Sequence, residues 1–392
     1  MPNPIRYEMV EMFVDTQPAW GGPIGVDPTS GHARLDFIQS HELSFNVDRP
    51  PLKQIGSSGF AARQSQLAPD VNFSINYLLN NGWNENFIGL NINTGAYENP
   101  FNKILTSSKD INFYIFITDR MGLDSNASTH NTLGLLGYDD SDLKILGIGN
   151  CYISNYNINL NINGLAEASC DFIGSNAEIS SSQSLVLNPS VDTTGSGESS
   201  NTIARFYIED SSRSSRYITG FKHVFDSGCP YYGCLISASP VASKGLKGGF
   251  DFDNFQSLDI SIPFERKAVY GFGNNFPFYR KIQKPIIGTM SLVSIVDTFE
   301  AYELANDFEQ EDKTISGFDF DITFGNADKI PKLGIKIQNA RLDSYSITQE
   351  IGPVSQIQTS WSFEINETTG ILMSGSYGLK TVSNRTTESI NL

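Results

Sequence analysis

Histidine and cysteine side chains carry much of the catalytic and metal chemistry of proteins, and this 392-residue chain has only four of each. A metal site, or a nucleophile with its base, needs such side chains in spaced sets. The histidines are scattered and have no neighbouring motif: His32, His41, His130 and His223. A lone loop histidine is more often a surface residue than a ligand, so we assign none of them a catalytic or metal-binding role.

The cysteines give an equally weak signal. Cys229 and Cys234 have four residues between them, but no second Cys or His pair follows. Zinc sites use tighter and doubled spacings, so we interpret these two as a buried pair in a turn. Four cysteines are also too few for a disulfide framework in a chain of this length.

Two acidic clusters offer the oxygen ligands that calcium prefers. They are Asp139, Asp140 and Asp142, and Asp251 with Asp253. Neither cluster follows the twelve-residue calcium loop, so solvated turns are the favoured interpretation. The paired carboxylates of a glycosidase converge only in three dimensions, and the sequence favours no pair over another.

Glycine motifs for phosphate binding or nucleophile activation do not occur. The Gly-x-Gly patterns at 147–149 and 271–273 lack the third glycine and the following helix of a dinucleotide site. The chain has neither a Gly-x-x-x-x-Gly-Lys-Ser/Thr loop nor a Gly-x-Ser-x-Gly elbow. We therefore predict a non-enzymatic chain with no catalytic, cofactor-binding or metal-binding residues and no cofactor.

Composition and charge limit the classes of function that remain. A net charge of −16 repels phosphate and argues against sequence-reading DNA binding. It fits either a surface past which DNA slides or ordinary solubility. The 39% of hydrophobic residues can fill the cores of two or three domains. Met1–Trp20 has no apolar signal-peptide run, and no stretch is long enough to span a bilayer. We expect synthesis in a cytoplasm, with retention there or release by lysis.

The elements that position these residues come in two similar sets. Residues 148–172 (IGNCYISNYNINLNINGLAEASCDF) and 337–361 (IQNARLDSYSITQEIGPVSQIQTSW) align without a gap, at an offset of 189 (339 − 150 = 345 − 156). The five identical pairs are Ile148/Ile337, Asn150/Asn339, Tyr156/Tyr345, Ile158/Ile347 and Ile162/Ile351. Cys151 and Cys170 align with Ala340 and Thr359, which indicates small core or near-core positions.

The openings of the two sets also match. Residues 41–79 and 258–296 each hold a strand, a glycine-bearing loop, a proline and a second strand. The segments 111–118 (INFYIFIT) and 318–324 (FDFDITF) each precede the terminal repeat. Period-two alternation predicts strands with one buried and one polar face. Helix is scarce: the best candidate is Asp297–Phe308, and the Asn- and Gly-rich region after Leu79 disfavours one.

The terminal repeat resembles the late strand pair of phage tail tube proteins: an Asn, a strand with Ser-Tyr, a Gly turn and a strand ending in an aromatic residue. In the first set the matching positions are Asn150, Ile153, Asn155, Tyr156, Ile158, Gly164, Ser169 and Phe172. In the second they are Asn339, Leu342, Ser344, Tyr345, Ile347, Pro353, Gln358 and Trp361, with Phe363 two residues on. Pro353 in place of Gly164 predicts a different turn in the second set.

The resemblance implies a mainly β fold with two tandem tube-type β-sandwich or half-barrel domains, each with at most one short helix, plus loops and a linker. The predicted divisions are a first domain at 1–179, a Ser/Thr/Gly-rich linker at 180–202, a second domain at 203–370 and a C-terminal tail at 371–392.

The resemblance also implies a structural virion protein, a tail tube subunit. Its trimeric, pseudo-hexameric rings would stack into the channel for DNA passage, with inner sheets joined into one barrel. The implied partners are further copies of the chain and other tail proteins: tape measure, tail terminator, distal tail or baseplate, or sheath. DNA would pass through the lumen without specific binding, and no membrane is involved. The location would be the virion tail, after synthesis in the host cytoplasm.

Two alternatives stay open. One is a distal tail or baseplate hub ring of the same fold. The other is a carbohydrate-binding β-sandwich in a receptor-binding module, for which an exposed aromatic platform would be needed. The tryptophans are Trp20, Trp83 and Trp361, and Trp361 falls on a predicted core position.

Overall fold

The structure is a computed structural model, and its strands dominate, so the predicted mainly β fold is confirmed. It describes residues 10–15, 32–46, 51–53, 55, 60–63, 70–79, 82–94, 96–106, 111–118, 143–161, 164–174, 176–180, 184–189, 201–205, 233–240, 250–251, 255–270, 277–295, 317–325, 331–348 and 356–375. We refer to residues 10–180 as the first half and to residues 233–375 as the second half.

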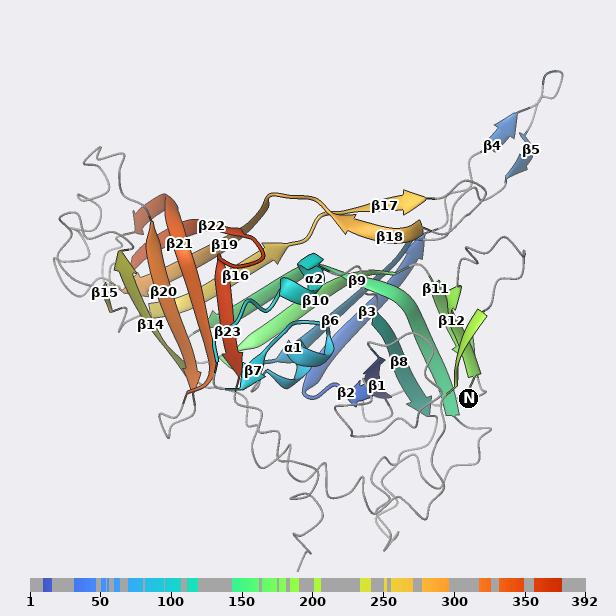
Figure 1. Cartoon of the computed structure of the whole chain (residues 1–392), viewed down its shortest axis with the longest axis horizontal. Helices are drawn as coiled ribbons and strands as arrows, with labels where there is room; N and C mark the ends of the chain where they lie inside the picture. Colours follow the sequence, from blue (N-terminus) through green and yellow to red (C-terminus); the bar gives the residue numbers. More distant parts are fainter. Residues whose placement is uncertain are drawn as a thin grey trace, which may run out of the picture.

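One antiparallel sheet, the inner sheet, runs through both halves (Figure 1). Its strands lie in the order β3 (Ile38–Asn46), β6 (Asp70–Leu78), β10 (Glu167–Gly174), β9 (Leu143–Asn161), β16 (Phe255–Pro263), β19 (Ile286–Ile295), β22 (Gln356–Ile365) and β21 (Pro331–Thr348). The first four strands belong to the first half and the last four to the second. The halves therefore meet edge to edge, at β9 and β16.

Each half adds an outer sheet that shares its longest strand with the inner sheet. The first outer sheet has the order β2 (His32–Arg34), β1 (Val10–Asp15), β8 (Ile111–Thr118), β9 and β11 (Asn176–Ser180). The second has the order β15 (Phe250–Asp251), β14 (Gly233–Pro240), β20 (Phe318–Gly325), β21, β23 (Ile371–Gly375) and, in parallel, β7 (Asn93–Thr94). Strands β9 and β21 thus join the two layers of each half.

A bulge with a left-handed asparagine marks the point where each long strand passes between sheets. Asn150 in β9 and Asn339 in β21 both have φ of 54°. Asparagine adopts this conformation more readily than most residues because its short side chain can hydrogen-bond locally. The Asn150 N–H donates to Oδ1 of Asn112 (3.1 Å), and the Asn339 N–H donates to Oδ1 of Asp319 (2.8 Å). The aligned asparagines of the repeat therefore occupy equivalent backbone positions.

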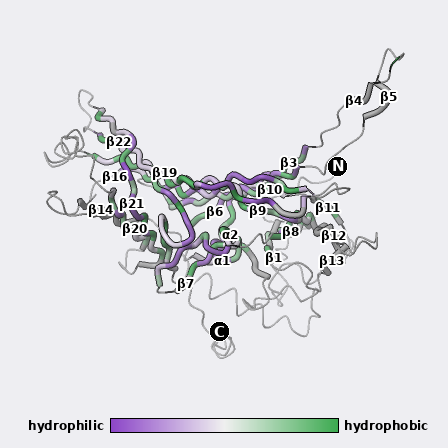
Figure 2. The backbone as a smooth tube through the Cα atoms, turned by 45° about the horizontal axis from the view of Figure 1, so that its top comes forward, coloured by the Kyte–Doolittle hydropathy of each residue, from purple (hydrophilic) through white to green (hydrophobic). Residues whose placement is uncertain are grey.

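The core lies between the inner and outer sheets. In the first half, the ring of Phe113 on β8 packs edge-on against Phe172 on β10, with centroids 4.7 Å apart. In the second half, Trp361 on β22 packs edge-on against Phe320 on β20 at 4.9 Å. Trp361 is buried, as its predicted core position requires. Hydrophobic and hydrophilic residues alternate along the inner-sheet strands, which leaves one polar face (Figure 2).

The two halves pair their strands in the same order. The pairs β1–β2, β1–β8, β3–β6, β6–β10, β10–β9, β8–β9 and β9–β11 correspond to β14–β15, β14–β20, β16–β19, β19–β22, β22–β21, β20–β21 and β21–β23. The registers agree too, because Tyr156 lies opposite Cys170 and Tyr345 lies opposite Thr359. Both pairs fit the offset of 189 from the sequence (345 − 156 = 359 − 170).

Two hairpins connect equivalent inner-sheet strands. The hairpin of β4 (Pro51–Lys53) and β5 (Phe60–Arg63) lies between β3 and β6. The hairpin of β17 (Arg266–Tyr270) and β18 (Pro277–Ile282) lies between β16 and β19. A third pair, β12 (Ser184–Pro189) with β13 (Asn201–Arg205), falls within and just beyond the range expected to be a linker.

The structure differs from the sequence prediction in two places. The first half contains two short helices, α1 (Trp83–Phe87) and α2 (Asn102–Thr106), where at most one was expected. Tertiary contacts form α1: the Asn84 amide bonds both backbone groups of Asp36, and Phe87 is buried. The predicted tail begins with β23, whose Ile371 and Met373 are buried. The helix expected at Asp297–Phe308 lies outside the described residues.

Candidate self-assembly interface

The seam between the halves is an antiparallel strand pair inside one chain. Residues 155–161 of β9 pair with residues 257–263 of β16, and Ile158 lies opposite Ile260. Both isoleucines are buried beneath the sheet, as are the neighbouring pair Leu160 and Leu258. The seam therefore combines backbone hydrogen bonds with a continuous apolar row, which is how one sheet edge recognises another.

Asparagine side chains form hydrogen bonds on the polar face of the seam. Asn159 Nδ2 donates across it to Asp259 Oδ1, and Asn161 Nδ2 donates to Asn159 Oδ1 at 2.8 Å. On the other side of β9, Asn157 Nδ2 donates to Ser169 Oγ at 3.2 Å. The asparagines of the alternating segment thus face away from the core, as the alternation predicts.

A segment of the first half, residues 82–106, crosses under the seam and packs on the second half. The ring of Phe101 lies 4.9 Å from Phe264 and 6.2 Å from Tyr156. Further along the second half, the Tyr97 ring lies 4.4 Å from the Lys336 ammonium. A Cβ on Gly334 would collide with Tyr97, so this glycine makes room for the crossing segment.

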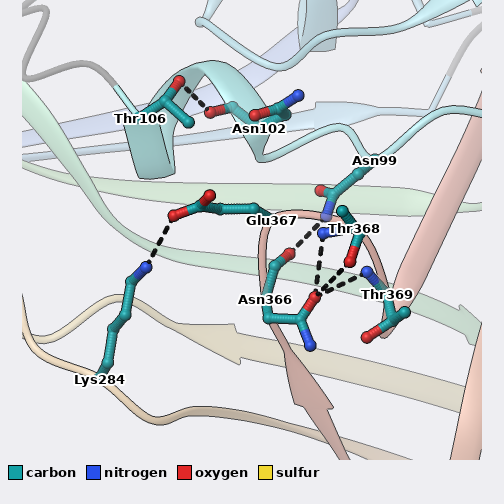
Figure 3. Close-up of polar contacts among 8 residues, drawn as sticks. All are labelled: Asn99, Asn102, Thr106, Lys284, Asn366, Glu367, Thr368 and Thr369. Atoms are coloured by element: carbon teal, nitrogen blue, oxygen red, sulfur yellow. Dashed lines mark hydrogen bonds and ion pairs between the residues drawn. The ribbon is translucent and has the colours of Figure 1, made fainter.

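The crossing segment also contacts the turn between β22 and β23 (Figure 3). The Asn99 side chain donates from Nδ2 to the backbone oxygen of Asn366 at 2.6 Å. Asn366 Oδ1 accepts the N–H groups of Thr368 (2.9 Å) and Thr369 (2.8 Å), which fixes the turn. An exposed ion pair, Lys284 with Glu367 at 3.0 Å, closes its outer side.

The β17–β18 hairpin reaches from the second half back over the first. Arg266 Nε donates to the backbone oxygen of Ile153 at 2.7 Å, and its guanidinium lies 5.2 Å from the Tyr152 ring centroid. Burial lowers the pKa of Arg266 to about 10, so it stays charged at neutral pH. Arg280 is buried and donates to Asp70 Oδ1 (3.2 Å) and to the backbone oxygen of Gly174 (3.3 Å). Two arginines therefore hold this hairpin beside the seam.

The outer ends of the inner sheet lack such partners among the described residues. Strand β3 pairs with β6 alone, and residues 341–348 of β21 pair with β22 alone. On β3, Phe45 is 68% exposed, whereas its equivalent on β16, Ile262, is fully buried at the seam (45 + 217 = 262). The offset of 217 is that of the matching strand pairs, because Leu43 opposite Phe73 corresponds to Ile260 opposite Met290.

A second apolar side chain shows the same asymmetry. In the outer sheets, Ala177 opposite Ile148 corresponds to Ile371 opposite Ile337, an offset of 194 (371 − 177). Ile179 on β11 is 67% exposed, but its equivalent Met373 is fully buried beneath the crossing segment (179 + 194 = 373). The Met373 N–H donates to the Glu98 carbonyl, and the Met373 carbonyl accepts the Glu98 N–H. The first half therefore exposes, at two places, the surface that the second half covers.

The buried polar cluster of the first half is the other arrangement with chemical potential. Glu85 on α1 accepts hydrogen bonds from the hydroxyl groups of Tyr77 (2.9 Å) and Tyr156 (3.4 Å). Burial raises the pKa of Glu85 to about 7, and it also raises the pKa values of both tyrosines and of the Cys170 thiol. All four groups are buried, so the cluster is a polar link between α1 and the inner sheet.

The candidate residues singled out from the sequence do not converge. His32, Cys234 and Asp251 lie on β2, β14 and β15, and His41 lies on β3. Cys151 and Cys170 are buried free thiols, as their core positions predict. The remaining candidates lie outside the described residues: His130, His223, Cys229, Asp139, Asp140, Asp142 and Asp253. Within the described residues, no three His, Cys, Asp or Glu side chains gather closely enough to hold a metal ion.

Sequence reasoning missed the two arginines at the seam. Arg266 and Arg280 lie in a hairpin whose strands, RKAVY and PFYRKI, do not alternate regularly between polar and apolar residues, so alternation gives no sign of their role. A signal was present, however, because position 266 − 217 is Arg49 and position 280 − 217 is Arg63.

Comparisons with known proteins give only weak structural likenesses. No protein-family model matches the chain, and no curated protein matches it. A chain of the anti-feeding prophage baseplate is similar over 37% of this chain and 94% of its own, at 13% identity and a TM-score of 0.29. A chain from the sheath/tube terminator of an extracellular contractile injection system is similar over 38% and 96%, at 12% identity and a TM-score of 0.29. A chain from the sheath–tube complex of such a system gives 14% identity and a TM-score of 0.27 over 37% and 89%. TM-scores this low do not assign a fold family.

In the part of the chain that the structure describes, no helix has the length and apolar character needed to cross a membrane.

Proposed function

We propose that the chain is a non-enzymatic structural subunit of a phage tail tube, whose copies close into trimeric rings that stack around a DNA channel. The observation that carries the proposal is the seam at β9 and β16. It joins two halves with the same strand pairing and leaves their equivalent outer edges, β3 and β21, unpaired among the described strands. Two halves that are so alike support an internal duplication into two tandem domains.

Ring closure would repeat the seam between copies. In the seam, Ser261 lies opposite Asn157. The equivalent positions on the free edges are Ser44 (261 − 217) and Ser346 (157 + 189). Strand β3 of one copy would therefore pair with β21 of the next, with Ser44 opposite Ser346. Such a contact is heterologous, the type that forms a closed ring when its rotation closes. Three copies would give the six-domain ring that the resemblance to tube proteins implies.

The polar face of the inner sheet would then line the lumen. Seven carboxylates lie on its described strands: Glu42, Asp70, Glu167, Asp171, Asp259, Asp343 and Glu364. On the same described strands the basic residue of this face is Arg341, and Arg280 of the β17–β18 hairpin pairs with Asp70. DNA phosphates would find few cations to neutralise them there, so DNA would pass without adhering.

Disulfide trapping tests the closure. In a chain with Cys229 and Cys234 replaced by serine, Ser44→Cys with Ser346→Cys should form intermolecular disulfides and yield covalent trimers on oxidation. Facing residues of an antiparallel pair lie within reach of a disulfide. The matched control, Asn157→Cys with Ser261→Cys, tests the same register inside one chain and should yield only oxidised monomer. No intermolecular bond at assembling concentrations would contradict the proposal.

Negative-stain electron microscopy of the same protein separates the related functions. Stacked hollow tubes are expected for a tube subunit. Single rings that never stack would indicate the distal tail or baseplate hub instead. A stable monomer at high concentration would point to a receptor-binding module, and glycan screening would follow.

A further inference from the structure

The paired strands β4 and β5, which we call the arm, project away from the body beyond β3, whereas β17–β18 lies over the first half (Figure 1). The arm connects β3 to β6 as β17–β18 connects β16 to β19. The two connections also have equal length, since Asn46 to Asp70 spans the same number of positions as Pro263 to Ile287 (70 − 46 = 287 − 263). The arm is therefore the equivalent of a hairpin that already has a docking site.

The arginines that dock β17–β18 occur again in the first half. Arg266 corresponds to Arg49, and Arg280 corresponds to Arg63 at the end of β5. The stretch 48–64 carries three basic residues and one acidic residue, in a chain of net charge −16. A basic arm on an acidic protein favours an acidic landing surface.

We propose that the arm of one copy docks on the second half of the neighbouring copy, with Arg63 as its anchor. This proposal rests on the proposed self-assembly, since the arm would dock beside the β3–β21 contact as β17–β18 docks beside the seam. The backbone oxygen of Gly174, which Arg280 binds, corresponds to that of Phe363 (174 + 189). By this equivalence the Phe363 carbonyl of the neighbour is the acceptor that we assign to Arg63.

The neighbouring copy also supplies a carboxylate for Arg63. Asp70, the acidic partner of Arg280, corresponds to Ile287 (70 + 217). Glu364 on β22 lies directly opposite Ile287 on β19, and both side chains are exposed on the same face of the sheet. The carboxylate of the second half therefore lies on β22, the strand next to the position that corresponds to Asp70. A guanidinium placed there as that of Arg280 is placed in the first half would still be within reach of it. Docking would also cover Ile287, which is 50% exposed.

The second arginine contributes less between copies than it does within one. Arg266 stacks on Tyr152, whose equivalent is Arg341 (152 + 189). The neighbouring copy therefore offers no ring at this position, and of the two groups that Arg266 contacts only the backbone carbonyl has an equivalent, at Leu342 (153 + 189). The arm contact depends mainly on Arg63 and Glu364, which makes it weaker and more reversible than the contact within the chain.

Charge exchange tests the arm. Arg63→Glu should raise the concentration for half-maximal assembly, measured by mass photometry, by about tenfold or more, because it replaces a charge-assisted contact with repulsion. Glu364→Arg should do the same, and the double variant should recover assembly to near the wild-type level. Lys53→Glu is the control for net charge: it makes the same charge change at the equivalent of Tyr270, an exposed residue near the hairpin tip, and should raise the assembly concentration much less than Arg63→Glu.

Cross-linking distinguishes a failure of the proposed arm contact from a failure of the proposed self-assembly. A short bis-maleimide should link Arg63→Cys to Ile287→Cys between copies, while Ser44→Cys with Ser346→Cys reports independently on the sheet edges. Suppose that the edge disulfides form, the arm cross-link does not, and Arg63→Glu has the same effect as Lys53→Glu. These results would contradict the proposed arm contact but would still support the proposed ring. Loss of both cross-links would overturn the proposed function as well. Far-UV circular dichroism of the free variants should match wild type, because the arm stands clear of the core.

Discussion

At the scale of single residues, Glu85 is a buried carboxyl group held by two tyrosine hydroxyls. Its Oε2 accepts no hydrogen bond from the described residues. Burial without a cation favours the protonated form, which explains why its pKa rises from 4.5 to about 7. The group ties α1, through Tyr77 and Tyr156, to the strands that lead to the seam.

The raised pKa of Glu85 predicts how stability depends on pH. Between about pH 4.5 and 7 the folded chain holds this proton and the unfolded chain does not, so the free energy of unfolding falls as pH rises. The total loss is on the order of 3 kcal/mol, complete above pH 7. Glu85→Gln should remove this slope, which urea unfolding at pH 5 and pH 8 would measure. An unchanged slope in the variant would show that Glu85 ionises normally.

At the scale of elements, the two long strands bend at equivalent asparagines. The sequence alignment pairs Asn150 with Asn339, yet alternation alone does not reveal the left-handed backbone that both adopt. This conformation depends on hydrogen bonds that the two asparagine N–H groups donate to Asn112 and Asp319 on the preceding strands, and these bonds form only when the outer sheet is in place. The strands could therefore be predicted from period two, but the crossing between sheets could not.

The left-handed backbone at the crossing predicts that the free energy of unfolding depends on the type of residue at position 339. Asn339→Val should lower the free energy of unfolding by about 1–3 kcal/mol, because a β-branched residue is strained at positive φ. Asn339→Gly, the matched control, should stay close to wild type, because glycine accepts this conformation. Thermal or urea unfolding of the two variants measures the difference. Equal stabilities would mean that the left-handed conformation is not required at the bulge.

The hairpins and short helices show why other elements escaped prediction. Helices α1 and α2 are each five residues long, too short for a periodic signal, and tertiary contacts hold them. The β17–β18 hairpin is held by arginines whose partners are mainly backbone oxygens of the first half. Such partners have no sequence signature, so the duplicated arginines become meaningful only when the strand registers supply the offset.

At the scale of the whole molecule, the two sheet edges have the strand pairing of the seam strands on one side and no partner among the described strands on the other. Exposed sheet edges are a liability that proteins cover or pair. Phe45 and Ile179 expose apolar surface where the equivalent residues of the second half are buried. Under the proposed head-to-tail contact both edges would be paired and Phe45 would be covered as Ile262 is at the seam, whereas a monomeric binding module would leave both edges unpaired.

The same ring predicts how DNA responds to the charge of the inner sheet. Assembled wild-type tubes should not retain DNA at physiological salt, because their lumen would be lined by carboxylates. Lysines in place of Glu167, Asp171 and Asp259 would create a cationic band at each ring and should retain DNA in a salt-dependent manner, measured by co-sedimentation. A matched triple variant carries the same lysines outside the inner-sheet strands, at Glu98, Glu265 and Glu367. It should retain far less DNA, because those residues do not belong to the inner-sheet strands. Equal retention by both variants would show that DNA responds to net charge alone and that the inner sheet does not face the channel.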